Sequence, residues 1–330
     1  MGLIDWLLGR RMLQRRRVGS AQLIFNPQHD HVVREYYLYV VELYSDALRA
    51  FGLSADIVFG EYPVTVKRNR RLFRVLFQIE HILVRPGGRG AAGAPPSVLP
   101  VLGHPEEHYL VRLQDADRLE QADTIVEYSQ PNFQHLHGSG HWPELAYRLH
   151  YIAPLIYPLA AAQTKDGREF AVVTLFGNPD EPRRKALLEA LTQWNPLCRN
   201  IHGRFSDVRE VYRNTRILVN IRQTEHHHTL EELRVLPALL SGVVVVCEDV
   251  PLRELVPYHP FIVWAPAGAV VDTVRHVHEN YDAYFQQIFG GPALNACIYR
   301  LQESNRVQVE VILKSFEARS RNPTDRIDPN

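Results

Sequence analysis

Short apolar runs alternate with amphipathic helical patterns along most of this chain, and this alternation restricts the folds that it can adopt. The run at 21–26 (AQLIFN) predicts a buried strand. Over 33–51 the apolar residues recur at spacings of three and four, which predicts a helix, and Gly52 follows where such a helix ends. The run at 55–59 (ADIVF) predicts a second strand. Two strands joined by a helix indicate a parallel sheet.

The alternation resumes in the second half of the chain, after a small, polar stretch at 160–168 that has no periodicity. The first half also holds an apolar stretch at 72–84, predicted strands at 109–113 and 124–128, and a Gly- and Pro-rich stretch at 86–96 that predicts a mobile loop. In the second half, strands are predicted at 170–176, 215–220, 243–247 and 261–264, and helices at 183–194, 208–214, 229–241 and over most of 270–318.

We therefore predict an α/β protein with two Rossmann-like parallel-sheet domains that face a central cleft and are closed by C-terminal helices. A length of 330 residues suits two such domains. The predicted parts are a basic and apolar N-terminal segment, two domains and a polar tail, at residues 1–20, 21–160, 161–318 and 319–330.

The composition excludes several kinds of partner and compartment. Lys plus Arg and Asp plus Glu both number 37, so the chain lacks the net basic charge that draws proteins to nucleic acids, and no nucleic acid is expected as a partner. Its three widely spaced cysteines suit neither a disulfide framework nor a thiolate zinc site, and they indicate a reducing compartment. No apolar stretch reaches the length of about 18 residues that a membrane span needs. We expect a cytoplasmic protein.

The first 17 residues combine apolar and cationic side chains. The apolar residues between Leu3 and Leu8 precede the arginines between Arg10 and Arg17, which reverses the charge order of a secretory signal. Trp6 stands where a myristoylation motif has Ser or Thr. Such a segment could make a peripheral contact with an anionic membrane, and the alternatives are a helix packed on the domain or a loose basic tail.

Polar clusters that directly follow predicted strands are the candidate sites, because open parallel sheets bind ligands beyond the carboxyl ends of their strands. The first cluster follows the strand at 21–26, where His29 and Asp30 adjoin. An imidazole can remove a proton from a hydroxyl, and a carboxylate can orient that imidazole or act as the base itself. The alternative is a turn in which Asp30 caps the following helix.

The second cluster follows the strand at 170–176 and carries Arg183 and Arg184 at the start of the next helix. Two guanidiniums near a helix N-terminus can bind a diphosphate through charge-assisted hydrogen bonds. Alternatively, both arginines pair with Asp180 and Glu181 at the surface.

The third and densest cluster follows the strand at 215–220. Its candidate binding residues are His226, His228, Thr229, Glu231 and Glu232. Thr229 and Glu232 have the spacing of a capping box, which leaves a helix N-terminus available to a phosphate. The run of histidines also suggests zinc, but adjacent side chains diverge, whereas metal-binding helices space their ligands four residues apart. The simplest alternative is a capped helix with exposed histidines.

The fourth cluster contains Glu127 and Ser129, with Glu80 comparable on an inner stretch. These residues could supply hydrogen bonds to an acceptor sugar or form a buried structural network. The chain has no dinucleotide fingerprint, Walker A loop or Gly-x-Ser-x-Gly elbow, which removes the commonest dehydrogenases, kinases and hydrolases.

Three strings carry a resemblance to a known family: EYSQPN at 127–132, YRNTRILVN at 212–220 and TEHHHTLEELRVLPAL at 224–239. Together with the two predicted domains, they make most of the chain resemble a glycosyltransferase of the GT-B type. The strings themselves are similar to glycosyltransferases of large algal DNA viruses such as the chloroviruses.

The resemblance implies a metal-independent hexosyl- or pentosyltransferase without a cofactor, which moves a sugar from a nucleotide-sugar donor to a hydroxyl of a glycan or glycoprotein acceptor. It places the acceptor on the first domain and the donor on the second, with Arg183 and Arg184 on the diphosphate, Thr229 assisting, and Glu232 on the ribose or sugar. A viral protein of this kind would act in the host cytoplasm.

The chain departs from the family pattern at one point, because six residues separate Glu225 from Glu232 where many members have seven. Pro237 also occupies the place where the second Glu of the family often stands. Two other functions stay open: a non-catalytic nucleotide-binding or scaffold protein, and a metal-dependent hydrolase built on the histidines.

Catalysis is predicted to depend on Asp30, with His29 as the alternative base. If Asp30 accepts the proton of the acceptor hydroxyl, Asp30→Asn lowers kcat by about 10² to 10⁴ and leaves donor affinity unchanged. Loss of a helix cap alone would cost about 1 kcal/mol of stability and little rate. Turnover and melting temperature of Asp30→Asn and His29→Ala, measured side by side, separate the two roles. Normal turnover in both variants would move the base elsewhere, with Glu80 and Glu127 next.

Overall fold

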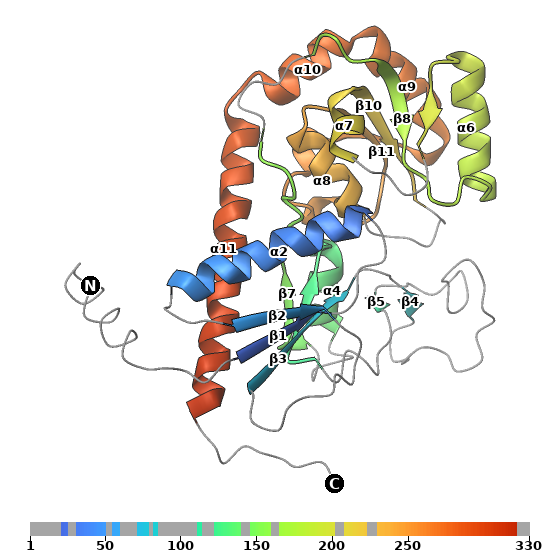
Figure 1. The fold of residues 1–330 in the computed structure, drawn as a ribbon. Helices are drawn as coiled ribbons and strands as arrows, with labels where there is room; N and C mark the ends of the chain where they lie inside the picture. The colour runs from blue at the N-terminus through green and yellow to red at the C-terminus, as the bar shows by residue number, and fades with distance from the viewer. Residues whose placement is uncertain are drawn as a thin grey trace.

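The computed structural model describes segments from both halves of the chain (Figure 1). The described residues are 21–25, 31–50, 55–59, 71–78, 82–84, 111–113, 122–139, 146–159, 165–201, 208–222 and 230–321. The predicted N-terminal segment, the loop predicted at 86–96 and the last part of the predicted tail lie outside these ranges.

Two five-stranded sheets organise the described chain, and neighbouring strands are parallel throughout both. The first sheet has the order β2-β1-β3-β6-β7, and the second has the order β12-β11-β10-β8-β9. The strands of the first are β1 (Ala21–Phe25), β2 (Ala55–Phe59), β3 (Arg71–Gln78), β6 (Thr124–Glu127) and β7 (Leu149–Tyr151). Those of the second are β8 (Phe170–Thr174), β9 (Arg199–Asn200), β10 (Thr215–Asn220), β11 (Val244–Glu248) and β12 (Val263–Ala265). The predicted α/β class with two parallel sheets is confirmed.

Both sheets share one strand order. Numbered along the chain within each sheet, the strands of both run 2-1-3-4-5 across the sheet. In this order the chain proceeds in opposite directions from the first strand, so a crevice opens at the carboxyl ends of strands 1 and 3. These strands are β1 and β3 in the first sheet, and β8 and β10 in the second.

The remaining described strands, β4 (Ile82–Val84) and β5 (Val111–Leu113), pair with each other in a separate antiparallel sheet. The apolar stretch at 72–84 is therefore divided between two sheets, with β3 between β1 and β6 and β4 outside. Two antiparallel strands can be joined without a helical crossover. The sequence between β4 and β5, which has no helical periodicity, is consistent with this kind of pairing.

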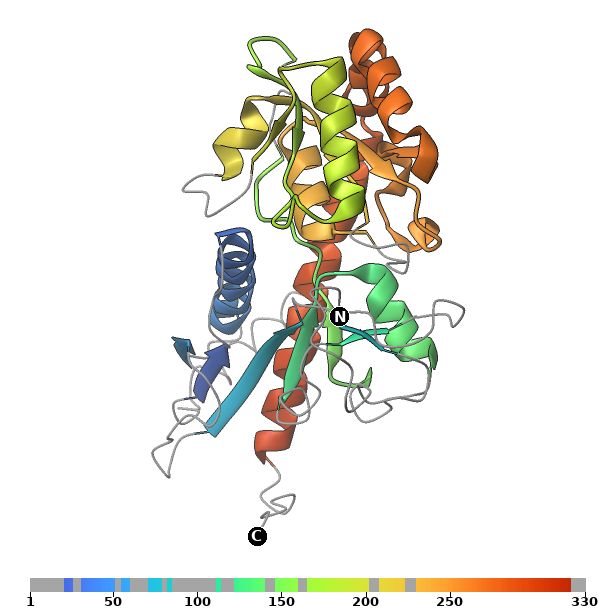
Figure 2. The ribbon, with the colours of Figure 1, turned by 90° about the vertical axis from the view of Figure 1, so that its right-hand side faces the viewer.

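Helices follow most of the strands and cover the sheets (Figures 1 and 2). They are α2 (His31–Ala50), α4 (Gln130–Ser139), α6 (Pro182–Trp194), α7 (Val208–Arg213), α8 (Glu232–Leu240), α9 (Val270–Glu279), α10 (Tyr281–Phe289) and α11 (Ala293–Arg321). The predicted helices at 33–51, 183–194 and 208–214 correspond to α2, α6 and α7. Within the described part of the chain, no helix has the length and apolar character that crossing a membrane requires.

Helix α8 begins later than predicted. Its first helical residue is Glu232, and the predicted start at Thr229 lies in the segment 223–229, outside the described residues. Glu232 therefore stands at the first helical position, not at the third one that a capping box needs. The helix ends at Leu240, and the φ of 75° at Gly242 allows the amide of Val243 to reach the carbonyl of Ala238 at 3.0 Å.

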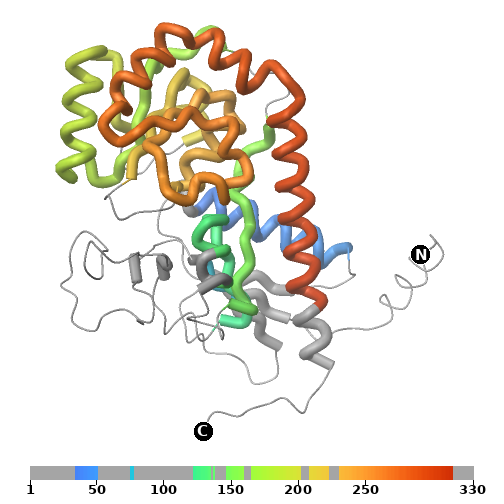
Figure 3. Tube along the Cα trace, turned by 180° about the vertical axis from the view of Figure 1, so that it is seen from behind, coloured from blue at the N-terminus to red at the C-terminus, as the bar shows by residue number. Residues whose placement is uncertain are grey.

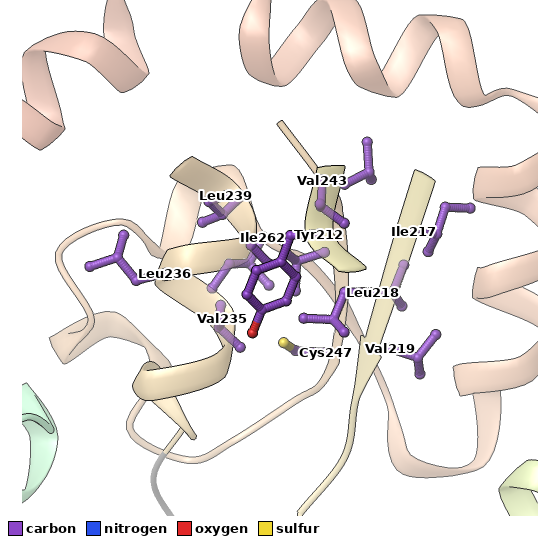
Figure 4. Packing of buried hydrophobic residues seen from close by; sticks show 14 of the residues in the cluster. Tyr212, Ile217, Leu218, Val219, Val235, Leu236, Leu239, Val243, Cys247 and Ile262 are labelled. Carbon is purple, nitrogen blue, oxygen red and sulfur yellow. The ribbon is translucent and has the colours of Figure 1, made fainter. Parts of the chain in front are cut away.

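The core of the second domain lies between α8 and the inner strands of its sheet. Val235, Leu236 and Leu239 of α8 pack with Leu218 of β10 and Cys247 of β11, and all five are essentially unexposed (Figure 4). Nearly every residue of α8 is buried, because the sheet covers one of its sides and the first domain covers its N-terminus. Leu233 belongs to the other core, among Tyr36, Tyr37 and Phe77 of the first domain.

Helix α11 takes part in both hydrophobic cores (Figures 1 and 3). Its first turns bury Leu294, Ile298 and Leu301 in the core of the second domain, whereas Val309 and Ile312 are buried with α2 in the core of the first. One continuous helix thus connects the two sheets. The prediction assigns all residues from 161 to 318 to the second domain, whereas α11 also contributes to the core of the first domain.

Asn305 lies on α11 where the helix passes from one core to the other. Its side chain is buried, accepts from the amide of Ala153 at 2.9 Å, and donates to the carbonyl of Ala153 and to the Tyr39 hydroxyl, also at 2.9 Å. An amide side chain that pairs both backbone groups of one residue fixes α11 against the segment that follows β7.

Asn305→Ala is expected to destabilise the protein by about 2 to 4 kcal/mol, because the buried amide and carbonyl of Ala153 lose their partner. Urea unfolding measures this loss. Asn295→Ala, at an exposed position of the same helix, is the matched control and should stay within about 0.5 kcal/mol of the wild type. Equal losses in the two variants would show that helix propensity, and not the Ala153 pairing, sets the cost.

Candidate active site between the two sheets

The carboxyl edges of the two sheets face each other. The Tyr128 hydroxyl, directly after β6 of the first sheet, donates to Oε1 of Glu231 at 2.8 Å, and Glu231 stands between β10 and α8 of the second sheet. The amide of Gln130 donates to Oε1 of Glu232 at 2.8 Å. The crevice that each strand order creates therefore opens toward the other domain, as the prediction of a central cleft requires.

Several predicted site residues lie outside the described residues. They are His29, Asp30, Glu80, His226, His228 and Thr229. The topology still shows which strands these residues follow along the chain. His29 and Asp30 follow β1, and the histidines follow β10, which are the strands at the two crevices. Their predicted roles stay predictions.

Arg184 is the residue of this region with the most unusual surroundings. It lies in the first turn of α6, directly after β8, and its backbone amide donates to the Glu181 carboxylate at 3.1 Å. The side chain is buried, with 6% of the residue exposed, and the guanidinium carbon lies 4.9 Å from the centre of the Phe176 ring. Its Nε atom is buried and has no hydrogen-bond partner.

Burial and, to a lesser degree, the neighbouring guanidinium of Arg234 lower the pKa of Arg184 to about 10, while Glu231 and Glu181 oppose the shift. At neutral pH the group is still charged. Arg184 is thus a buried cation next to a second guanidinium, that of Arg234, and its Nε donor is unused.

Arg183 has a different environment. Its guanidinium forms an ion pair with Glu248, the last residue of β11, and donates to the carbonyl of Arg222 at 3.0 Å. Glu248 also accepts from the side chain and from the amide of Arg222, both at 2.9 Å. The alternative that both arginines pair with Asp180 and Glu181 therefore does not describe the structure, because Arg183 pairs with Glu248 and the Glu181 carboxylate accepts from the backbone amide of Arg184.

A pocket of about 530 Å³ lies beside this ion-pair cluster, at the carboxyl ends of the strands of the second sheet. Its lining residues are Arg222, Asp249, Val250, Pro251, Arg253, Glu254 and Ala267. The volume is in the range of small-molecule sites, and the lining combines two carboxylates with two guanidiniums and a short apolar wall.

Glu127 and Ser129 belong to a buried network at the start of α4. The Glu127 carboxylate accepts from the amide of Ser129 at 2.8 Å and from the side chain of Asn132 at 2.6 Å, and all three residues are unexposed. Of the two interpretations that the sequence leaves open, the structure places these residues in the structural network. Their predicted contact with an acceptor stays a prediction.

Glu232 is fully buried and receives hydrogen bonds from both domains. Besides the amide of Gln130, its carboxyl group accepts from the hydroxyls of Tyr151 at 3.0 Å and Tyr258 at 3.1 Å, both on Oε2. Burial raises the pKa of Glu232 to about 8, although the three donors act in the opposite direction. The residue that the resemblance assigns to the donor therefore faces the first domain and is neutral for the most part at pH 7.

Sequence reasoning missed most of the partners that make this arrangement. Tyr151, Tyr258 and Glu248 carry no recognisable motif, and Tyr128 lies in the string EYSQPN, which does not indicate its partner. The contacts of these residues join positions between 26 and 103 residues apart. The one available signal was position, because Glu248 directly follows the apolar run at 243–247.

A metal centre finds no support in the described ranges, which hold no group of three or more His, Cys, Asp or Glu side chains suited to bind an ion. The histidine run lies in the segment 223–229, outside those ranges. The zinc alternative is therefore not tested by this geometry.

No protein-family model matches the sequence. An uncharacterized protein of Acanthamoeba polyphaga mimivirus is 28% identical over 130 residues, which are 38% of this chain and 46% of that protein. The match thus spans about half the length of that curated relative.

Two of the solved structures that match each cover most of this chain, both at TM-scores below 0.5. One is the DNA-modifying enzyme β-glucosyltransferase, studied with and without uridine diphosphoglucose, at a TM-score of 0.46, 12% identity, and coverage of 90% of this chain and 98% of that one. Another is T4 phage BGT in complex with UDP and Mn²⁺, at a TM-score of 0.46, 11% identity, and coverage of 90% and 99%. The narrower likeness to chlorovirus proteins stays a prediction.

The raised pKa of Glu232 makes stability depend on pH. In the unfolded chain the carboxyl loses its proton near its ordinary pKa of 4.5, whereas in the folded protein it keeps the proton until about pH 8. This contribution is therefore full below pH 4.5 and is lost as the pH rises toward 8. Between pH 5 and 9 the free energy of unfolding should fall by about 4 kcal/mol more in the wild type than in Glu232→Gln. Denaturant titrations at several pH values measure this difference, and parallel curves would contradict it.

Proposed function

We propose that the protein is a metal-independent glycosyltransferase that binds a nucleotide sugar on the second domain and transfers the sugar to a hydroxyl of a glycan acceptor on the first. The observation that carries this proposal is Arg184: a buried guanidinium in the first turn of a helix at the sheet crevice, with a side-chain nitrogen that has no partner. A buried cation in this condition is costly, and an anion that binds it removes the cost.

A diphosphate suits this position better than a carboxylate or a monophosphate. Each charge-assisted hydrogen bond to it contributes about 1.5 to 3 kcal/mol, and its two phosphates can reach both Arg184 and the more exposed Arg183. The guanidiniums supply the positive charge that many transferases obtain from a divalent ion at the leaving group. This division of roles is the physical basis for proposing metal independence.

The neighbouring pocket offers a place for the sugar and the nucleoside. Asp249 and Glu254 can accept hydrogen bonds from ribose or sugar hydroxyls, and Val250 and Pro251 give an apolar wall against which a base can lie. His226, His228 and Thr229 follow β10 at the same crevice, and we propose that they complete the donor site. Glu232 is not part of this proposal as a donor ligand, because it is fully buried and its oxygens already accept three hydrogen bonds.

The acceptor is proposed to bind at the crevice of the first sheet, beyond β1 and β3. There Asp30, or His29 in its place, would accept the proton of the acceptor hydroxyl while that oxygen bonds to the anomeric carbon and the bond from this carbon to the diphosphate breaks. The positive charge of Arg184 would stabilise the departing diphosphate. Donor and base thus stand on different domains, with the acceptor between them.

Binding of nucleoside diphosphates tests the donor site. UDP, GDP and CDP are compared with uridine, guanosine and cytidine by thermal shift and calorimetry, on the wild type, on Arg184→Ala and on Lys185→Ala, an exposed neighbour on the same helix. Arg184→Ala should weaken the best diphosphate by about 10- to 100-fold and change its nucleoside little, because only the diphosphate carries the charge. Lys185→Ala should leave both unchanged.

Equal losses for the diphosphate and the nucleoside would make Arg184 structural and would contradict the proposed site. Cleavage of the matching nucleotide sugar then separates the enzyme from a non-catalytic nucleotide-binding protein. A panel of donors and glycan acceptors is tested for this purpose. If the protein binds a nucleotide but shows neither sugar transfer nor slow hydrolysis of any donor, a non-catalytic nucleotide-binding protein is favoured.

A further inference from the structure

The carboxylate of Glu248 holds two guanidiniums at once. Glu248 is the last residue of β11, and its side chain is almost entirely buried. Its Oε2 atom accepts from the backbone amide of Arg222 at 2.9 Å. Its Oε1 atom accepts from the side chain of Arg222, also at 2.9 Å, and from the side chain of Arg183. One oxygen is therefore fixed to the backbone, while the other orients two cations.

A further hydrogen bond closes this group into a ring. The Arg183 guanidinium also donates to the backbone carbonyl of Arg222 at 3.0 Å. Each of the three residues thus contacts the other two, and we call them the Glu248 triad. Arg183 lies in the first turn of α6, Arg222 follows β10 by two residues, and Glu248 ends β11. The triad therefore joins three elements at the carboxyl edge of the second sheet.

The triad carries one positive charge in excess, because two guanidiniums share a single carboxylate. The exposed fraction of the side chain is 1% for Glu248, 15% for Arg222 and 32% for Arg183. The acid is thus withdrawn from solvent, whereas both cations keep exposed surface. An anion can approach the guanidiniums without direct contact with the carboxylate that holds them.

The two arginines of the triad also belong to the two parts of the proposed donor site. Arg183 stands beside Arg184 at the start of α6, and Arg222 lines the pocket of about 530 Å³. Glu248 directly precedes Asp249, which lines the same pocket. A ligand that extends from α6 into the pocket would therefore meet this pair of guanidiniums.

We propose that Glu248 is a positioning residue of the donor site, which holds Arg183 and Arg222 as a pair for the diphosphate and does not contact the donor itself. The proposal rests on the proposed function, and it adds Arg222 to the cations of the site. A long arginine side chain loses conformational entropy when it is fixed. Because the bonds to Glu248 fix both guanidiniums before the donor binds, this entropy is lost during folding and does not weaken binding.

Neutralisation of charge is the other role that a carboxylate can have beside two arginines. A carboxylate that only neutralises them weakens their attraction for an anion, so its removal should tighten diphosphate binding. A carboxylate that positions them has the opposite effect, because without it the two like-charged guanidiniums move apart and their donors lose the geometry that suits phosphate oxygens. The direction of the change in affinity therefore distinguishes the two roles.

Two substitutions of Glu248 separate its charge from its position. Glu248→Gln keeps the length of the side chain and removes the charge, whereas Glu248→Asp keeps the charge and withdraws the carboxylate by one methylene group. Calorimetry measures the Kd of UDP, GDP, CDP and their nucleosides on both variants, on the wild type and on Glu189→Asp, an exposed control on α6. Both Glu248 variants should bind the best diphosphate about 10-fold more weakly and its nucleoside with unchanged Kd. Glu189→Asp should leave both Kd values unchanged.

A double-mutant cycle tests whether Glu248 acts through Arg222. Arg222→Ala alone should also weaken diphosphate binding by about 10-fold. If Glu248 acts through the pair, Glu248→Gln should cost less affinity in the Arg222→Ala background than in the wild type. Melting curves identify a variant that has failed to fold, and the Asp and Gln variants can replace each other in the cycle.

Tighter or unchanged diphosphate binding in Glu248→Gln would overturn the proposal, as would wild-type affinity in Glu248→Asp. Fully additive losses in the cycle, or equal losses for diphosphate and nucleoside, would show that Glu248 supports the fold and not the guanidinium pair. If the wild type binds no nucleoside diphosphate, the proposed function fails together with this role. If the wild type and Arg184→Ala behave as expected and the Glu248 variants do not, only the role of Glu248 fails.

Discussion

The burial of one helix in two hydrophobic cores is the constraint on which the rest of this structure depends. The apolar positions of α11 enter the second core through Leu294 and Ile298 and the first core through Val309 and Ile312. A continuous helix is stiff over this length, so the two sheets cannot reorient freely while both ends remain buried. The facing of the two carboxyl edges, and with it every contact across the cleft, follows from this shared packing.

Several polar side chains are buried at the cleft. In an ordinary apolar core, burying such groups would cost free energy. Glu127, Glu232 and Glu248 are almost unexposed, and each receives several donors: backbone amides, tyrosine hydroxyls or guanidiniums. Satisfied networks of this kind fix one geometry, since a shift of either domain leaves donors or acceptors unpaired. The cleft is therefore held by directional bonds where the cores alone would leave the separation of the edges loosely defined.

The sequence predicted the elements because their signals are local. The period of the apolar residues identified α2, α6 and the inner strands, and the succession of strand and helix identified the parallel sheets. It also predicted candidate residues at the crevices, because a residue that follows a strand stays near the end of that strand, and among the described residues Arg183 and Arg184 lie at the start of α6, the helix that follows β8.

Contacts between distant positions could not be predicted in this way. The bond between Tyr128 and Glu231 joins residues 103 positions apart, and nothing local distinguishes this tyrosine from any other core tyrosine. The interpretation of Glu232 depended on where α8 begins, and a start at Glu232 turned a predicted capping residue into a contact with the first domain. A shift of three residues at a helix terminus, the least certain feature of any sequence-based prediction, thus changes the inferred role of a whole cluster.

The charges around the cleft are the reason for proposing an anion at α6 and not at α8. The sequence allowed a phosphate at the N-terminus of either helix. The start of α8 already carries Glu231 and the buried, mostly neutral Glu232, and a phosphate there would meet the carboxylate of Glu231.

Near α6 the balance is the opposite. Among the described residues, the guanidiniums of Arg183, Arg184, Arg222 and Arg234 gather with the carboxylates of Glu181, Glu231 and Glu248, which leaves one positive charge in excess. Arg183 and Arg222 share the single carboxylate of Glu248, so the excess lies on that pair, whereas Arg184 and Arg234 lie near Glu181 and Glu231. Arg184 differs from the other three in its ring contact with Phe176, and its buried Nε atom has no hydrogen-bond partner. The positive end of α8 thus meets acids of the chain itself, whereas the start of α6 keeps a buried guanidinium, and the proposed diphosphate site rests on this difference.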